Sequence, residues 1–408
     1  MTMLCCLAFL QLITGGPAAE HCPAARLPAC PPEVVPPASI DWVPLARLVD
    51  SAVEAGAAPG AVVAISIGGV QYIHGTGRLG IGDTTRPDPA TIYDLASLTK
   101  VIGLTTGLML AVTEGRIELD APVQRYVPSF TGPFKERVTI RHLLTHSSGL
   151  RDGRRLWQET PDAAAARALV DSTPLDTVPG ARMVYSDLGA MILTRALESV
   201  YQTRIDTLLA ARVFGPLGMR TTRFLPPAEW HPHIAPTEDD PWRGRVLRGE
   251  VHDENAAWLG GVSGHAGLFS TAEDLLVFGE WLLRLTVGRS DGRIAPAVAR
   301  EFLRRQELVP GSSRALGWDT PSDNSSAGSR LSSRSWGHTG FTGTSIWTDP
   351  DRKLVIVLLT NRVHPTRQNN GHVALRRAVA DLAASIADAS NLVDMYGSSH
   401  LTLSPNYR

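Results

Sequence analysis

Lysine is almost absent from this chain of 408 residues, which has only Lys100, Lys135 and Lys353. Arginine fills the other basic positions, so composition alone does not explain a lysine at any one of these places. The formal net charge is −1 and the sequence has no basic run, which argues against nucleic-acid binding through a basic face. The sequence also has no internal repeat, which argues against a solenoid or a propeller.

Cysteine is absent after residue 30, since the four cysteines are Cys5, Cys6, Cys22 and Cys30. Thiol nucleophiles and cysteine-ligated zinc sites are therefore excluded for the rest of the chain. Residues 1–19 contain an apolar segment followed by small residues, which is typical of a signal peptide, or of a short anchor because a basic start is missing. The segment is too short to predict a stable membrane span. Cys5 and Cys6 would leave with a signal peptide, and Cys22 and Cys30 could pair in the periplasmic or secreted location that this predicts.

The remaining chain predicts one large catalytic domain. Charged residues make up 19% and apolar residues 43%, which is enough to bury a sizeable core. Apolar alternation with turn signals predicts strands at 61–67, 70–74, 334–340, 344–348 and 353–360. Helical periodicity predicts helices at 41–55, 97–114, 138–146, 271–285 and about 375–386, with further helices across 160–220 and loop at 226–250.

This order of elements predicts an α/β (α+β) fold, in which an antiparallel sheet is flanked by helices and a helical lobe is inserted. We expect an Ala/Pro-rich linker at 20–40 and a catalytic domain at 41–388, followed by a tail at 389–408. Residues 41–115 and 320–388 would form the sheet lobe, and residues 116–319 the helical lobe. A cleft between the lobes is the natural place for a site.

Ser97 and Lys100 form the most informative pair, because Ser-x-x-Lys occurs once in the chain. Lys100 begins a long apolar run, where an ammonium group is costly unless it is paired or loses its proton. On a helix, Ser97 would lie on the same face three residues earlier. A hydroxyl beside a lysine that can become neutral is a nucleophile beside a base.

Two further motifs follow in order, Tyr185-Ser186-Asp187 and His338-Thr339-Gly340. The three motifs together resemble the signature of the β-lactamase-like serine hydrolases. These include class C β-lactamases, D-alanyl-D-alanine carboxypeptidases and esterases of the same fold. The resemblance runs from about residue 41 to 388. It implies an acyl-serine enzyme without cofactor or metal, acting on a small-molecule ester, a β-lactam or a cell-wall peptide.

The resemblance also implies roles for individual residues. Ser97 would be the nucleophile, and Lys100 and Tyr185 would transfer protons, with either one as the base. The backbone N–H groups of Ser97 and Phe341 would bind the developing oxyanion, where losing one donor typically costs roughly 10²–10³ in rate. Thr339 and Gly340 would complete the substrate-facing strand. If Asp94 caps the helix, Ser97 lies in its first turn, where the helix dipole favours negative charge.

Two departures from the family pattern bear on the substrate. Asp187 stands where the family has asparagine, and it would raise the pKa of Lys100. His338 stands where many members have lysine, and histidine is only partly charged at neutral pH. Both changes leave less positive charge for an anionic β-lactam, so they predict faster turnover of esters or a wall-derived amide than of cephalosporins.

Residues 251–265 resemble the corresponding part of wall-recycling hydrolases that act on muropeptides. Within this segment His252 and Asp253 could line the cleft, or they could form a buried polar turn that holds a loop.

Three other sequence patterns suggest different functions, but each is a weaker signal than the three catalytic motifs. The segment 75–80 matches a dinucleotide fingerprint but is followed by prolines, and 261–265 lacks the last glycine of a nucleophile elbow. His142-x-x-x-His146 has metal spacing without the glutamate of the protease motif. A non-catalytic binding module would have lost Ser97, Lys100 or Tyr185.

Overall fold

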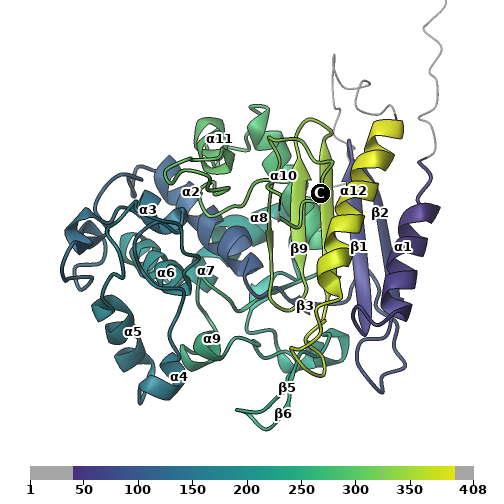
Figure 1. Ribbon diagram of the computed structural model, residues 1–408, viewed down its shortest axis with the longest axis horizontal. Coiled ribbons are helices and arrows are strands. Elements are labelled where there is room, and N and C mark those ends of the chain that lie inside the picture. Colours follow the sequence, from purple (N-terminus) through teal and green to yellow (C-terminus); the bar gives the residue numbers. More distant parts are fainter. Residues whose placement is uncertain (1–39, 324, 391–408) are drawn as a thin grey trace, which may run out of the picture. The chain divides into compact units, whose positions relative to one another are not determined.

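The computed structural model describes residues 40–323 and 325–390, and these form a mixed α/β fold (Figure 1). Its main sheet has five antiparallel strands in the order β2-β1-β10-β9-β8. The strands are β1 (Gly60–Ile67), β2 (Val70–Gly77), β8 (Trp336–Thr339), β9 (Ser345–Asp349) and β10 (Leu354–Thr360). The prediction that strands from both ends of the chain join one antiparallel sheet is therefore confirmed.

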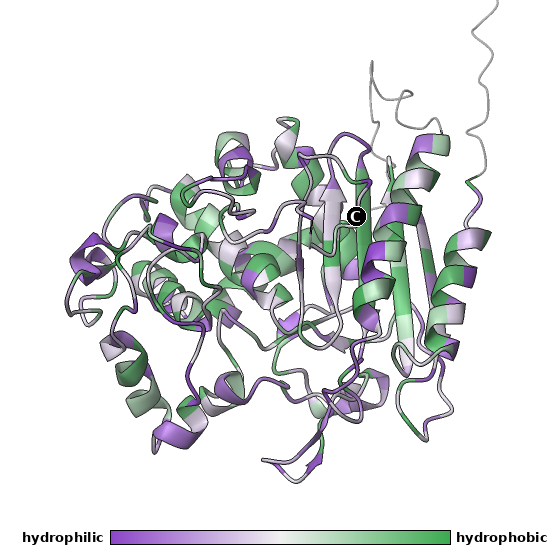
Figure 2. Cartoon of the chain, in the orientation of Figure 1, coloured by the Kyte–Doolittle hydropathy of each residue, from purple (hydrophilic) through white to green (hydrophobic). Residues whose placement is uncertain are grey.

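The central strands are buried on both faces because their side chains alternate between two cores. On β10, Val355, Val357 and Leu359 face one core, while Leu354, Ile356 and Leu358 face the other. Burying one such side chain stabilises the fold by roughly 1.5–3 kcal/mol. Figure 2 shows apolar residues along these strands and polar residues on outer turns of the last helix.

Helices cover both faces of the sheet. Helices α1 (Val43–Glu54) and α12 (His372–Ala389) pack together on one face, and α10 (Ala272–Thr286) packs on β1 and β10 from the other (Figure 1). Helix α10 falls in the segment that was assigned to the helical lobe, but it packs directly on the face of the main sheet opposite α1 and α12. The hairpin between β1 and β2 turns at Gly68 and Gly69, whose φ angles of 57° and 93° suit glycine.

Residues 116–319 supply most of the helices. They are α3 (Ile140–Leu144), α4 (Leu156–Glu159), α5 (Ala163–Ser172), α6 (Asp187–Tyr201), α7 (Ile205–Leu209), α8 (Gly215–Leu217), α9 (Glu254–Trp258), α10 and α11 (Pro296–Leu303). The side chains of Asp162, Ser186 and Thr271 accept backbone N–H groups and so cap α5, α6 and α10. The segment expected as loop at 226–250 contains a short 3₁₀ helix, Ala228–His233, and the ribbon β5 (Asp239–Asp240) and β6 (Arg245–Val246).

A three-stranded sheet lies next to the catalytic motifs, in the order β3-β7-β4. Its strands are β3 (Tyr93–Asp94), β4 (Arg223–Phe224) and β7 (Leu268–Ser270). After β3 the chain becomes helical at Leu98, passes through π-helical turns at Lys100–Thr105 and continues as α2 (Thr106–Thr113). Such π-helical turns are frequent at functional sites.

The expected signal peptide, the Cys22–Cys30 pair and residues 391–408 of the expected tail lie outside the described residues. Among the helices of residues 40–323 and 325–390, none combines the length and apolar character needed to cross a bilayer.

Candidate active site

Ser97 lies in a tight turn between β3 and the buried helical segment. Ala96 has a φ of 46°, a left-handed conformation that is strained for a residue with a side chain. The Asp94 carboxylate holds this turn by accepting the Ala96 N–H at 2.8 Å. The prediction that Asp94 caps the helix is therefore wrong: it is a buried strand residue, and the first helical turn opens with Leu98 N–H donating to the Leu95 carbonyl.

Lys100 is 3% exposed, and its ammonium group makes three contacts. Its Nζ donates to Ser97 Oγ at 3.0 Å and to the His265 carbonyl at 2.9 Å, and it forms an ion pair with Asp187 at 2.7 Å. Burial by itself lowers the pKa of Lys100, but Asp187 and Tyr185 outweigh burial and raise the pKa above its usual value. Lys100 is thus an ammonium that donates to Ser97, and it can act as a base only after losing a proton.

The ring of Tyr185 lies between two cations. Its centre is 5.1 Å from Lys100 Nζ and 5.3 Å from the guanidinium carbon of Arg314, and the His146 ring packs 4.5 Å from it. The Tyr185 hydroxyl is buried and makes no hydrogen bond of normal geometry with the residues that the structure describes. Two positive charges thus lie beside the ring of the residue that is predicted to transfer a proton.

The third motif ends the edge strand β8 beside the cleft. Burial, followed by the charges of Arg314 and Lys100, holds the pKa of His338 well below its usual range, so this side chain is neutral at neutral pH. Its Nδ1 lies 2.8 Å from the Thr339 carbonyl and donates to it. At Gly340 a Cβ atom would collide with Thr344 and the Leu95 carbonyl, so only glycine fits.

The predicted oxyanion donors come from these two segments. Within the described parts of the chain, neither the Ser97 N–H nor the Phe341 N–H has a hydrogen-bond acceptor. The Thr342 hydroxyl donates to the Asp94 carbonyl at 2.7 Å and so ties the β8–β9 connection to the nucleophile turn. Two free backbone donors beside the nucleophile suit a developing oxyanion.

His252 and Asp253 do not line the cleft around Ser97. His252 is buried; its N–H donates to Asp94 at 2.7 Å, and its Nε2 lies 2.9 Å from the Glu238 carboxylate. Asp253 caps α9 and lies 2.9 Å from His265 Nε2. His252 is therefore part of a buried polar turn, as the alternative expectation had it, while the Asp253 side chain is 31% exposed.

The sequence reasoning missed a group of arginines in the cleft. The cleft has a volume of about 460 Å³, and its lining includes Ser97, Tyr185, Thr339 and Phe341. Four arginines also line it: Arg314, Arg362, Arg376 and Arg377. Asp319 is the one acidic residue of this lining, so the cleft carries positive charge that the reasoning from His338 and Asp187 did not include. Arginine is common throughout the chain and these four come from three distant segments, so no sequence pattern marked them.

The arginines are held in different ways. The Nε and Nη1 atoms of Arg314 are buried and lack hydrogen-bond partners among the described residues. Arg376 Nη2 donates at 2.6 Å to the Gly340 carbonyl, which fixes the third motif. Burial, followed by the charge of Arg362, lowers the pKa of Arg376 to about 9, so it stays positive at neutral pH. Neither Arg314 nor Arg377 has a side-chain hydrogen bond or ion pair to a described residue, and of these two it is Arg314 that packs on the Tyr185 ring.

The two histidines with metal-like spacing have other roles. His142 Nδ1 contacts the Thr139 hydroxyl at 2.9 Å at the start of α3, and His146 Nδ1 accepts the Ser186 N–H at 3.1 Å. Within residues 40–323 and 325–390, no group of three or more His, Cys, Asp or Glu side chains could hold a metal ion.

A comparison with protein families gives a match to the β-lactamase model over residues 45–381. The chain belongs to the β-lactamase family. One curated relative, from Salmonella paratyphi B, is 31% identical over 309 residues, and the match covers 67% of this chain and 70% of the relative. It is named a putative D-alanyl-D-alanine carboxypeptidase, and the relative from Salmonella newport has the same name and identity. Membership of the β-lactamase family makes this protein a serine hydrolase.

Solved structures agree on the fold of the β-lactamase family. EstCE1, a hydrolase with promiscuous acyltransferase activity, has a TM-score of 0.65 and 23% identity, over 82% of this chain and 97% of that protein. A class C β-lactamase has a TM-score of 0.66 and 18% identity, over 85% of this chain and 99% of that protein. At these identities the likeness concerns the fold alone.

Proposed function

We propose that this serine hydrolase cleaves the amide bond of a peptide that ends in a free carboxylate, through an acyl-Ser97 intermediate. The observation that carries this proposal is Arg314. Its guanidinium group faces the cleft beside Tyr185, with buried donors that have no partner in the described chain. A carboxylate is the group that a guanidinium binds best, because both the charge and the donor geometry match. A terminal carboxylate bound there would lie on the leaving-group side of Tyr185.

The reaction follows from the contacts around Ser97. Ser97 Oγ attacks the carbonyl carbon while its proton passes to Lys100 or Tyr185, and the N–H groups of Ser97 and Phe341 bind the oxyanion. The C–N bond then breaks, and Tyr185 gives a proton to the departing amine. Water hydrolyses the acyl-Ser97 ester and returns the proton to the serine. Overall, one amide and one water are converted into one carboxylic acid and one amine.

The charge state of Lys100 sets a condition on the first step. Lys100 is an ammonium in the structure, so it must first release a proton if it is to accept the one from Ser97. The Asp187 carboxylate, 2.7 Å away, opposes this loss because it stabilises the charged form of Lys100. If Tyr185 is the base instead, the charged Lys100 stabilises its phenolate. The names of the curated relatives support a peptide substrate under either assignment.

A short-chain ester is the second candidate substrate. The same acylation applies, and the neutral His338 favours it because an uncharged ester needs no anchor charge on that strand. The likeness to the hydrolase EstCE1 supports this candidate.

Matched substrates test the proposal. The kcat/KM for a D-alanyl-D-alanine peptide should exceed that of its C-terminal amide, and Arg314→Gln should lower only the first value. We expect a loss of about 10- to 100-fold, on the scale of one charged hydrogen bond. Arg304→Gln, which changes an exposed arginine paired with Glu301, is the control. Equal rates for acid and amide, unaffected by Arg314→Gln, would leave the ester as the better substrate.

We further propose a periplasmic or secreted location. The apolar segment near the N-terminus and the confinement of all cysteines to residues 5–30 support it. Fractionation of cells that express the full chain tests this location.

A further inference from the structure

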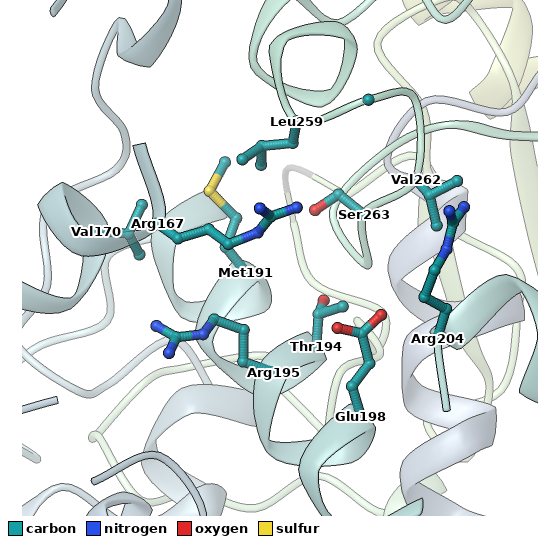
Figure 3. A pocket seen from close by; sticks show the side chains of 11 residues that line it. Arg167, Val170, Met191, Thr194, Arg195, Glu198, Arg204, Leu259, Val262 and Ser263 are labelled. Atoms are coloured by element: carbon teal, nitrogen blue, oxygen red, sulfur yellow. The ribbon is translucent and has the colours of Figure 1, made fainter. Parts of the chain in front are cut away.

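A second cavity lies between α5, α6, the start of α7 and residues 259–263 (Figure 3). Its volume is about 170 Å³, and none of its lining residues also lines the catalytic cleft. Val170, Met191, Leu259 and Val262 supply apolar walls. The hydroxyls of Thr194 and Ser263 also belong to its lining.

The charged groups of this cavity are unevenly paired. Arg195 is bound to Asp171, and Arg204 is bound to Asp206 at 2.7 Å. The Arg167 side chain has neither a hydrogen bond nor an ion pair to any described residue. Figure 3 shows the Arg167 guanidinium and the Ser263 hydroxyl pointing toward one another. One positive donor group is therefore free at the cavity.

The cavity also holds one carboxylate. Glu198 accepts the Ile205 N–H at 3.0 Å through Oε1, and it has no ion pair within the described ranges. Burial raises the pKa of Glu198, although Arg167 and Arg204 act in the opposite direction. In Figure 3 the Glu198 carboxylate extends from α6 toward Ser263. A bound cation near it would offset the cost of its burial.

These features select the chemistry of a ligand. A simple anion would be repelled by Glu198, and a simple cation would be repelled by the guanidinium groups. A molecule that carries both charges satisfies Arg167 and Glu198 together. A cavity of about 150 Å³ holds benzene, so about 170 Å³ has room for roughly six to eight non-hydrogen atoms. An α-amino acid with a small apolar side chain has this size, both charges and an apolar part for the walls.

We propose that this cavity binds a small apolar α-amino acid, and that binding slows acylation of Ser97. The carboxylate binds Arg167 and the Ser263 hydroxyl, the ammonium binds Glu198, and the side chain contacts the apolar walls. The site is separate from the proposed carboxypeptidase cleft and does not depend on that activity.

A short chain of contacts joins the cavity to Lys100. Ser263 Oγ lies 2.7 Å from His265 Nδ1, and His265 Nε2 lies 2.9 Å from Asp253. The His265 carbonyl accepts a hydrogen bond from Lys100. A ligand that takes the Ser263 hydroxyl breaks its contact with His265 and lets this carbonyl move. Lys100 is then misplaced relative to Ser97, and misplaced groups react more slowly.

Calorimetric titration of Ser97→Ala protein with alanine, as either enantiomer, tests binding without turnover. Arg167→Gln and Glu198→Gln should each weaken binding by about tenfold or more. Arg47→Gln is the matched control, because Arg47 is exposed on α1 and, like Arg167, has no partner in the described chain. Inorganic phosphate and ethylamine, which carry charge of only one sign each, should bind more weakly than alanine. Absence of alanine binding, or binding that Arg167→Gln leaves unchanged, overturns the site.

The link to Ser97 has a separate readout. A covalent serine probe should acylate the wild-type protein and Arg47→Gln more slowly in saturating alanine, by about fivefold, the low end of typical coupling between sites. Arg167→Gln should show no such slowing. Alanine that binds without slowing the probe overturns the link to Lys100. Because neither readout uses a peptide substrate, failure of the carboxypeptidase proposal would leave both results interpretable.

Discussion

Replacing Asp187 by asparagine removes the charge that holds Lys100 as an ammonium. Two unit charges 2.7 Å apart attract by about 6 kcal/mol at an effective dielectric constant of about 20. The Asp187 side chain is 32% exposed, and solvent screening reduces this to about 3 kcal/mol. That energy corresponds to a lower pKa for Lys100 and to a roughly 100-fold larger neutral fraction at a fixed pH below it.

The assay is the pH dependence of Ser97 acylation by a neutral ester. A lysine whose pKa is raised is neutral in a smaller fraction of molecules at every pH below it, so acylation rises with pH. Asp187→Asn should move this rise toward lower pH. At a fixed pH below the pKa of Lys100 in both proteins, the acylation rate should increase by about 10- to 100-fold. The lower figure allows for the fact that a lysine with a lower pKa is a weaker base.

The matched control is Asp176→Asn. The Asp176 side chain is 33% exposed and pairs with Arg151 at 2.8 Å, but it does not contact Lys100. This variant should keep the wild-type profile. If Asp187→Asn leaves the profile in place, or lowers the rate at every pH while the protein stays folded, Lys100 is not the base that Asp187 restrains.

Four further outcomes are expected. A covalent serine probe should label the peptide containing Ser97, and Ser97→Ala should lower turnover by as much as about 10⁶; labelling of another serine would refute the assignment. Lys100→Ala and Tyr185→Phe should each impair acylation without unfolding, and additive losses in the double variant would indicate independent roles. Gly340→Ala should destabilise the fold by about 1–3 kcal/mol in denaturant unfolding, because its Cβ has no space; an unchanged midpoint would contradict this. His338→Lys should raise kcat/KM for cephalosporins relative to kcat/KM for esters. A wild-type kcat/KM for cephalosporins of about 10⁴ M⁻¹s⁻¹ or more would contradict the predicted preference for esters or a wall-derived amide.

The sequence by itself determined the sheet, most helices and the order of the three motifs. Strands such as β10 were predictable because a short apolar run between turn signals is a local pattern. Helix α10 was predictable because Thr271 and the apolar periodicity after it lie in one continuous segment. Ser97 and Lys100 were found for the same reason, since their spacing is short and unique in the chain.

Only the tertiary structure decided the electrostatics of the site. Lys100 meets the His265 carbonyl across 165 positions of sequence, and its protonation depends on burial, on Asp187 and on Tyr185. Arg314 precedes the third motif in the sequence and Arg376 follows it, yet both line one cleft. No local sequence pattern distinguishes these two arginines from the others in the chain. A pKa depends on every charge within a few ångströms and on burial, and neither can be read from neighbours in sequence. Local patterns thus supplied the reactive groups, while long-range packing set their charge and the substrates they can bind.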